Sequence, residues 1–136
     1  MTTEQARQIA ELLNSRNQLT IPYTADRVKA SEDDYVFECE SDEVFACVQV
    51  KKVQWYQSEI LHLSVRTDHE GEGWGKRLIA RAEQRAKERG ARIAQCTIRV
   101  GNIGSESVFR ESCFRETCRF INAASGNEVA VFQKTL

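Results

Sequence analysis

Several features are scarce in this sequence of 136 residues, and each scarcity excludes a class of protein. No run of apolar residues approaches the length of about 20 that a membrane-spanning helix needs, so no membrane segment is expected. The polar start MTTEQARQ lacks the basic and then apolar pattern of a secretory signal, which predicts a cytoplasmic protein. The net charge is only -1, so the chain offers no overall basicity for nucleic acid or for an anionic membrane.

Patterns typical of metal sites are equally scarce. The two histidines, His62 and His69, are too few and too poorly placed to complete a zinc site with the cysteines. The five cysteines form no CxxC pair and lie mostly in apolar stretches, so we expect small core residues and no metal. These cysteines are Cys39, Cys47, Cys96, Cys113 and Cys118.

What is present is the periodicity of one folded domain over residues 1–136, because this length suffices for one core and not for two. Helical spacing after Thr2 predicts a helix over 3–16, and Pro22 marks a loop over 17–34 with a short turn of helix. From Tyr35 the apolar period becomes two, which predicts antiparallel strands at 35–40, 43–55 and 58–66. In the third strand, alternation predicts one face with Glu59, Leu61, Leu63 and Val65, and another with Ile60, His62 and Ser64.

The second half continues with a glycine-rich turn and a helix that ends at Gly90, where glycine is a favoured C-terminal cap. A strand over 91–100, a helix over 105–112 and strands at 117–121 and 128–134 follow. This order predicts an α+β fold in which helices flank a mixed, mostly antiparallel sheet. If the strand at 128–134 lies at a sheet edge, it could pair across a two-fold axis and form a homodimer.

The glycine-rich turn is the segment EGEGWG at 70–75, which follows a predicted strand and opens a predicted helix. Glycines let a backbone approach a ligand closely, and the amides of a helix N-terminus attract phosphate oxygens, so the turn indicates a pyrophosphate site. A tight turn that needs glycine only for its backbone angles is the alternative. The preceding three-strand meander disfavours a Rossmann fold, and Arg77 after Lys76 breaks the P-loop pattern.

Two segments together resemble the GNAT superfamily of acetyl-CoA-dependent N-acetyltransferases. LHLSVRTDHEGEGWGKRLIARAEQRA resembles the family's strand ending in aliphatic-x-Val, followed by Gln/Arg-x-x-Gly-x-Gly/Ala at the start of a long helix. VGNIGSESVFRESCF resembles the later segment in which an Asn begins a helix that ends in Gly-Phe. The resemblance implies a GNAT-type acyl-CoA N-acyltransferase fold and direct transfer of an acetyl group from acetyl-CoA to a primary amine of a small molecule or protein.

The resemblance also implies roles for particular residues. The backbone of Leu63, Ser64 and Val65 would pair with the pantetheine arm of coenzyme A. Asn102 would contact the same arm, although an Asn after a strand is also a common turn residue. Phe109 stands at the position of a family tyrosine in the cofactor site. The pyrophosphate loop would comprise Glu70, Gly71, Glu72, Gly73, Trp74 and Gly75, with Lys76 next.

Three departures from the family pattern matter. Glu70 replaces a Gln or Arg, and with Glu72 it would repel a diphosphate by roughly 1 kcal/mol per carboxylate. Phe109 cannot give a proton to the departing thiolate, which leaves solvent, the substrate, Cys113 or Ser107 as sources. The net positive helix after the loop, over 76–89, could meet a 3'-phosphate or could be a solvated basic face.

For the general base we expect Glu59, six residues before Val65, because the histone-acetyltransferase branch carries its glutamate base at that position. Partial burial would raise the pKa of the Glu59 carboxyl toward the working range of a base. The alternative is a surface glutamate at the start of a strand. His62 is predicted to point to the opposite face and to be structural.

Other interpretations stay open at this stage. A dense acidic run between 26 and 43 could attract a polyamine, an aminoglycoside or a lysine side chain if it borders the acceptor cleft. The chain could instead be a catalytically silent module that binds coenzyme A or a protein partner. A nucleic-acid-binding domain rests only on the basic helix. The acidic residues of the run are Asp26, Glu32, Asp33, Asp34, Glu38, Glu40, Asp42 and Glu43.

Overall fold

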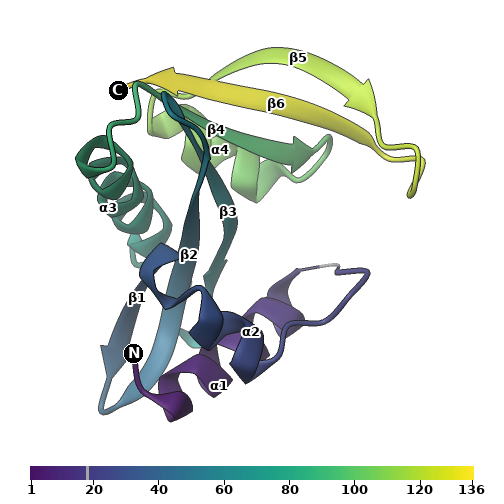
Figure 1. Ribbon diagram of the computed structural model, residues 1–136. Helices are drawn as coiled ribbons and strands as arrows, with labels where there is room; N and C mark the ends of the chain where they lie inside the picture. The colour runs from purple at the N-terminus through teal and green to yellow at the C-terminus, as the bar shows by residue number, and fades with distance from the viewer. Residues whose placement is uncertain (18) are drawn as a thin grey trace.

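The computed structural model describes residues 1–17 and 19–136, and it has one mixed sheet with helices on both faces (Figure 1). The strand order is β1-β2-β3-β4-β6-β5, in which β3 and β4 run parallel and the other neighbours antiparallel. The strands are β1 (Tyr35–Glu40), β2 (Glu43–Gln54), β3 (Gln57–Val65), β4 (Ile93–Arg99), β5 (Arg115–Ile121) and β6 (Glu128–Thr135). The helices are α1 (Thr3–Arg16), α2 (Ala25–Ala30), α3 (Trp74–Glu88) and α4 (Ile103–Glu111), with short 3-10 turns at Glu32–Asp34 and Thr67–His69. The predicted α+β class and element order are confirmed.

Helix α1 begins where the sequence predicts, because Thr2 and Gln5 form a capping box. The Thr2 hydroxyl accepts from the Gln5 amide at 3.0 Å, and the Gln5 side chain accepts from the Thr2 amide at 2.8 Å. Its apolar stripe, with Ile9 and Leu13 fully buried, packs with Val28 of α2 into one core. This core covers one face of β1–β3 (Figure 1).

Helices α3 and α4 cover the opposite face. Leu78 and Ile79 of α3 and Phe109 of α4 join Phe132 of β6 in a second core, together with residues of β2, β3 and β4. The sheet therefore separates α1 and α2 from α3 (Figure 1). Among the described residues, no helix combines the length and the apolar character needed to cross a membrane.

The predicted alternation along β3 is wrong beyond Leu61, because the strand contains a bulge. His62 has a φ of 54°, and the pairing with β2 shifts between Cys47 and Gln49. Such an irregularity reverses the side-chain parity. Leu63 and Val65 consequently pack into the α3 core alongside Ile60, instead of sharing a face with Glu59.

Two further expectations need correction. Strand β6 lies between β4 and β5, so its backbone is paired on both sides and it cannot pair across a two-fold axis. The edges of the sheet are β1 and β5. Of the cysteines, Cys47 and Cys96 are buried as predicted, but Cys39 and Cys118 on these edge strands and Cys113 after α4 are exposed.

Candidate active site

The candidate site begins where β3 and β4 part. Within residues 1–17 and 19–136, their parallel pairing covers three positions and ends at Glu59 and Gln95. Beyond this point β3 continues beside β2 as far as Val65, while β4 continues beside β6 as far as Arg99. Figure 1 shows the two strands diverging. We call this region the β3–β4 split; it leaves one backbone edge of residues 61–65 without a neighbouring strand in the described part of the chain.

The glycine-rich loop closes one end of the split. Gly71 has a φ of 79° and Gly73 a φ of 83°, so both adopt a left-handed conformation that favours glycine. Gly73 is the N-cap of α3, and no side chain of the described residues caps that helix start. Gly75 packs closely against its neighbours, because a Cβ there would lie 3.3 Å from Val108 Cγ2 and 3.7 Å from Leu63 Cδ2. The start of α3 therefore has no side-chain cap among the described residues, and its first amides can bind an anion.

The two loop carboxylates that could repel a diphosphate have cationic or histidine partners. Glu70 pairs with Arg16 at the end of α1. Glu72 lies 2.6 Å from Nδ1 of His69, whose Nε2 lies 2.8 Å from a carboxylate oxygen of Glu40. The His69 ring also stacks on Phe45, with ring centroids 4.1 Å apart. The loop is thus held to α1 and to β1, and its acidity is partly neutralised.

Leu63, Ser64 and Val65 lie along the split as the sequence predicts. Leu63 and Val65 pack into the core near Trp74, the first residue of α3. The buried Ser64 hydroxyl donates to the His62 carbonyl at 2.9 Å and accepts from the Asn17 side chain at 2.9 Å. Asn17 follows the last residue of α1, so this contact fixes the end of α1 against the bulge.

Glu59 is half-buried at the last position of β3 that pairs with β4. Burial raises the pKa of its carboxyl above the usual value, and a hydrogen bond from Gln95 lowers it by a smaller amount. Glu59 lies on the face opposite to α3, because its neighbours Ser58 and Ile60 are buried on the α3 side and Gln95 lies opposite Glu59. A base with a raised pKa at the root of a strand split suits proton transfer from an amine.

Sequence reasoning missed Gln95 and Gln133. The amide of Gln133 donates to Gln95 Oε1 at 2.6 Å, and the amide of Gln95 donates to Glu59 Oε2 at 3.2 Å. The signal available was weak: in the strand over 91–100 the apolar positions alternate, so Gln95 had to face away from them. Only the register of three strands brings the two glutamines to Glu59.

The other predicted residues lie around the split with differing exposure. Asn102 is the N-cap of α4 and its side-chain oxygen accepts from the Ser105 amide at 3.3 Å, so this oxygen already has a structural partner. Phe109 is 4% exposed and packs edge-on against Phe114, which leaves little of the ring for a cofactor. Lys76 is exposed in the first turn of α3.

The predicted orientation of His62 is wrong, because the bulge turns its side chain to the face of the sheet that α1 and α2 cover, which is also the face of Glu59. The His62 ring lies 5.5 Å from the ring of Tyr23, edge to face. Burial lowers the pKa of His62, and the nearby Arg27 lowers it further. Among the described residues, no group of three or more His, Cys, Asp or Glu side chains could hold a metal ion.

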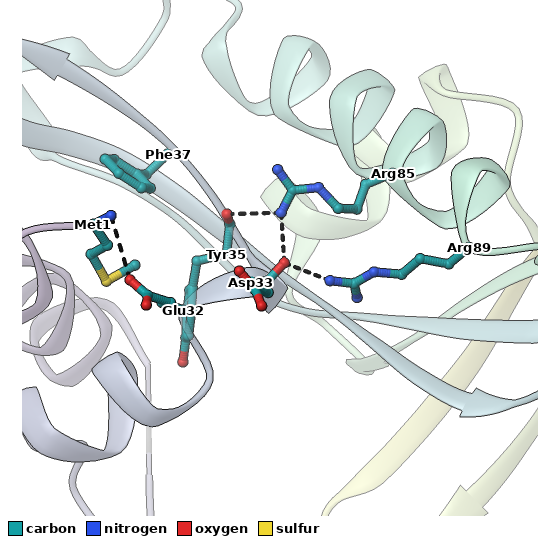
Figure 2. Close-up of a pocket in the computed structure, with 7 residues that line it drawn as sticks. All are labelled: Met1, Glu32, Asp33, Tyr35, Phe37, Arg85 and Arg89. Atoms are coloured by element: carbon teal, nitrogen blue, oxygen red, sulfur yellow. Dashed lines mark hydrogen bonds and ion pairs between the residues drawn. The ribbon is translucent and has the colours of Figure 1, made fainter.

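Part of the acidic run meets the basic face of α3 at the β1 edge of the sheet, a region that we call the α3–β1 edge (residues 33–38 with Arg81, Arg85 and Arg89). Arg81 pairs with Glu38, and Arg89 lies 3.1 Å from the Asp34 carboxylate. A groove of about 420 Å³ opens there (Figure 2).

Figure 2 shows that the guanidinium groups of Arg85 and Arg89 in this groove point at backbone oxygens. Arg85 donates to the carbonyls of Asp33 at 2.7 Å and Tyr35 at 3.2 Å. Two carboxylates of the acidic run, those of Glu38 and Asp34, are paired with arginines of the basic helix.

Comparison with known sequences settles the family. The sequence model described as the acetyltransferase (GNAT) family matches residues 4–113, which is most of the chain. The chain belongs to the GNAT acetyltransferase family. A search of curated proteins with the sequence of this chain found no match.

Solved structures agree on the fold of this GNAT protein. Salmonella typhimurium yncA, solved with its cofactor acetyl-CoA, has a TM-score of 0.85 at 16% identity over 100% of this chain and 91% of its own. The ribosomal-protein-alanine N-acetyltransferase from Brucella melitensis has a TM-score of 0.82 at 18% identity, covering 100% and 97%. A chain of the NatC complex bound to Gag peptide and CoA has a TM-score of 0.83 at 15% identity, covering 99% and 92%.

Proposed function

We propose that this protein is an acetyl-CoA-dependent N-acetyltransferase, acting as a single domain, in which Glu59 is the general base for a primary amine. The observation that carries the proposal is the position of Glu59, at the root of the β3–β4 split and at the far end from the glycine loop. Solved neighbours that contain acetyl-CoA or CoA support the choice of cofactor.

The residues present fit this cofactor. The diphosphate would lie against the α3 N-terminus at Gly73, where the loop carboxylates are already paired with Arg16 and His69. The pantetheine arm would lie along the open backbone edge of Leu63 to Val65. When bound, acetyl-CoA supplies an activated acetyl thioester.

The chain contributes a base and a fixed geometry. A Glu59 carboxylate oxygen would take the proton from an acceptor ammonium and so leave a neutral nitrogen able to attack the thioester carbonyl. Backbone amides at the bulge of His62 and Leu63 would polarise that carbonyl. Since Phe109 is buried and has no hydroxyl, we assign the thiolate proton to the substrate amine or to solvent.

The acceptor is a primary amine of a small molecule or a protein. The polycation alternatives lose part of their support, because Glu38 and Asp34 of the acidic run are paired with arginines at the α3–β1 edge. Neighbours whose names include a protein N-acetyltransferase and a complex with a peptide favour a peptide or protein amine as the first class to test.

The deciding experiment is a calorimetric titration with acetyl-CoA, with Gly73→Glu as the blocking variant. Gly90→Glu is the matched control, because Gly90 also has a positive φ and open space but lies at the other end of α3. We expect micromolar binding in the wild type and the control, and at least tenfold weaker binding in Gly73→Glu.

A panel of amines with detection of free thiol then tests the reaction. Binding without turnover of any amine would favour the catalytically silent module, for which the buried Phe109 is the specific observation. A dissociation constant of about 1 mM corresponds to a binding free energy of only about 4 kcal/mol. Absence of binding up to about 1 mM acetyl-CoA would therefore contradict the proposed cofactor.

A further inference from the structure

A row of three polar side chains crosses the sheet at the root of the β3–β4 split. Glu59 of β3 lies directly opposite Gln95 of β4, and Gln95 lies directly opposite Gln133 of β6. Adjacent strands lie roughly 5 Å apart, so each of these side chains can contact the next one across the sheet. All three are half-buried.

The hydrogen bonds in this row have one direction. Gln133 Nε2 donates to Gln95 Oε1 at 2.6 Å, and Gln95 Nε2 donates to Glu59 Oε2 at 3.2 Å. A glutamine amide has a donor end and an acceptor end. If the Gln95 amide turned over, its oxygen would face the Glu59 carboxylate and its nitrogen would face the Gln133 nitrogen. The Glu59 carboxylate only accepts hydrogen bonds, and the bond from Gln133 to Gln95 Oε1 stabilises the orientation in which Gln95 presents its nitrogen to Glu59.

The donor that reaches Glu59 acts on the charged form of the carboxyl. A hydrogen bond to a carboxylate stabilises the ion relative to the acid, whereas burial does the opposite. The effect of Gln95 on the pKa of Glu59 has this direction. Without the amide, a half-buried carboxyl would hold its proton more tightly and would also lose a fixed orientation.

We propose that Gln95, oriented by Gln133, is a positioning residue that keeps Glu59 ionised and aimed at the acceptor amine. This proposal rests on the proposed function. In the step concerned, one N–H bond of the ammonium breaks and one O–H bond forms on Glu59. Gln95 and Gln133 exchange no proton and act only through Glu59.

The test combines carboxyl NMR of Glu59 with a pH–rate profile in Gln95→Leu. We expect the pKa of Glu59 to rise and the acidic limb of kcat/KM to move to higher pH by the same interval. The loss in kcat should be about tenfold near the limb, with the KM for acetyl-CoA unchanged. Gln133→Leu should give a smaller shift of the same sign, and it keeps the test open if Gln95→Leu does not fold.

Gln84→Leu is the matched control, because Gln84 also donates to a glutamate, Glu88, at 3.4 Å, but on the exposed face of α3. It should leave both readouts unchanged. An unaltered pKa of Glu59 in Gln95→Leu would overturn the proposal. A shifted pKa in a protein that acetylates no amine would instead contradict the proposed function and, with it, the catalytic role of the pair.

Discussion

The α3–β1 edge and the β3–β4 split both carry ionisable groups, but the partners of these groups differ. At the α3–β1 edge, arginines of α3 bind carboxylates and carbonyl oxygens of residues 33–38. At the split, the Glu59 carboxyl is half-buried and receives its hydrogen bond from a neutral amide. A charge that is matched by an opposite charge stabilises the fold, whereas one that is desolvated beside neutral groups is available for proton transfer.

The largest effect that this comparison predicts is on catalysis. Glu59→Gln should lower kcat by about 100- to 10,000-fold, because it removes a general base without changing side-chain shape. The dissociation constant of acetyl-CoA should stay the same, since Glu59 lies away from the glycine loop. Stopped assays of thiol release with saturating amine measure the loss. A retained kcat would assign the base elsewhere.

The second prediction concerns the α3–β1 edge, where substitutions should affect stability and leave kcat unchanged. Arg89 donates to Asp34 at 3.1 Å and to the Val50 carbonyl at 2.9 Å while only 24% of its side chain is exposed. Arg89→Met leaves these acceptors unpaired and should lower the free energy of unfolding by about 1–3 kcal/mol. Urea denaturation checks this value.

The control for this prediction is Arg7→Met on α1, whose two ion pairs with Glu4 and Glu11 lie on the surface. Exposed pairs contribute about 0–1 kcal/mol, so the control should be nearly neutral. A loss of amine acetylation in Arg89→Met, at a temperature where the variant is folded, would mean that the α3–β1 edge takes part in function.

The two regions also differ in how far the sequence predicts them. The glycine loop follows from local spacing, as do α1 and its capping box at Thr2, whereas the choice of Glu59 follows from the resemblance to the GNAT superfamily. The pairing of Arg89 with Asp34 joins residues that are 55 apart in the chain, so no local pattern indicates it. The reversal of side-chain direction at His62 depends on a register shift against β2. The inner position of β6 depends on its pairing with β5. Neither pairing can be seen in a local pattern.

The smallest predicted effect is on the melting temperature, when the same substitution, glutamate to glutamine, is made in each region. Glu59 has a raised pKa in the folded protein, so its contribution to stability is present below the unfolded pKa and is lost as the pH rises through the folded pKa. Glu59→Gln should therefore raise the melting temperature at neutral pH, by less than Arg89→Met lowers it. The gain should disappear in acid.

Glu32, which lines the groove at the α3–β1 edge, should give the opposite sign. A hydrogen bond from Lys29 at 2.7 Å lowers the pKa of Glu32, so its contribution is present above the unfolded pKa and is lost as the pH falls through the folded pKa. Glu32→Gln should lower the melting temperature at neutral pH and have no effect in acid. If both variants shifted stability in the same direction, the distinction between matched charges at one edge and a desolvated carboxyl at the split would fail, because only the environments of the two glutamates differ.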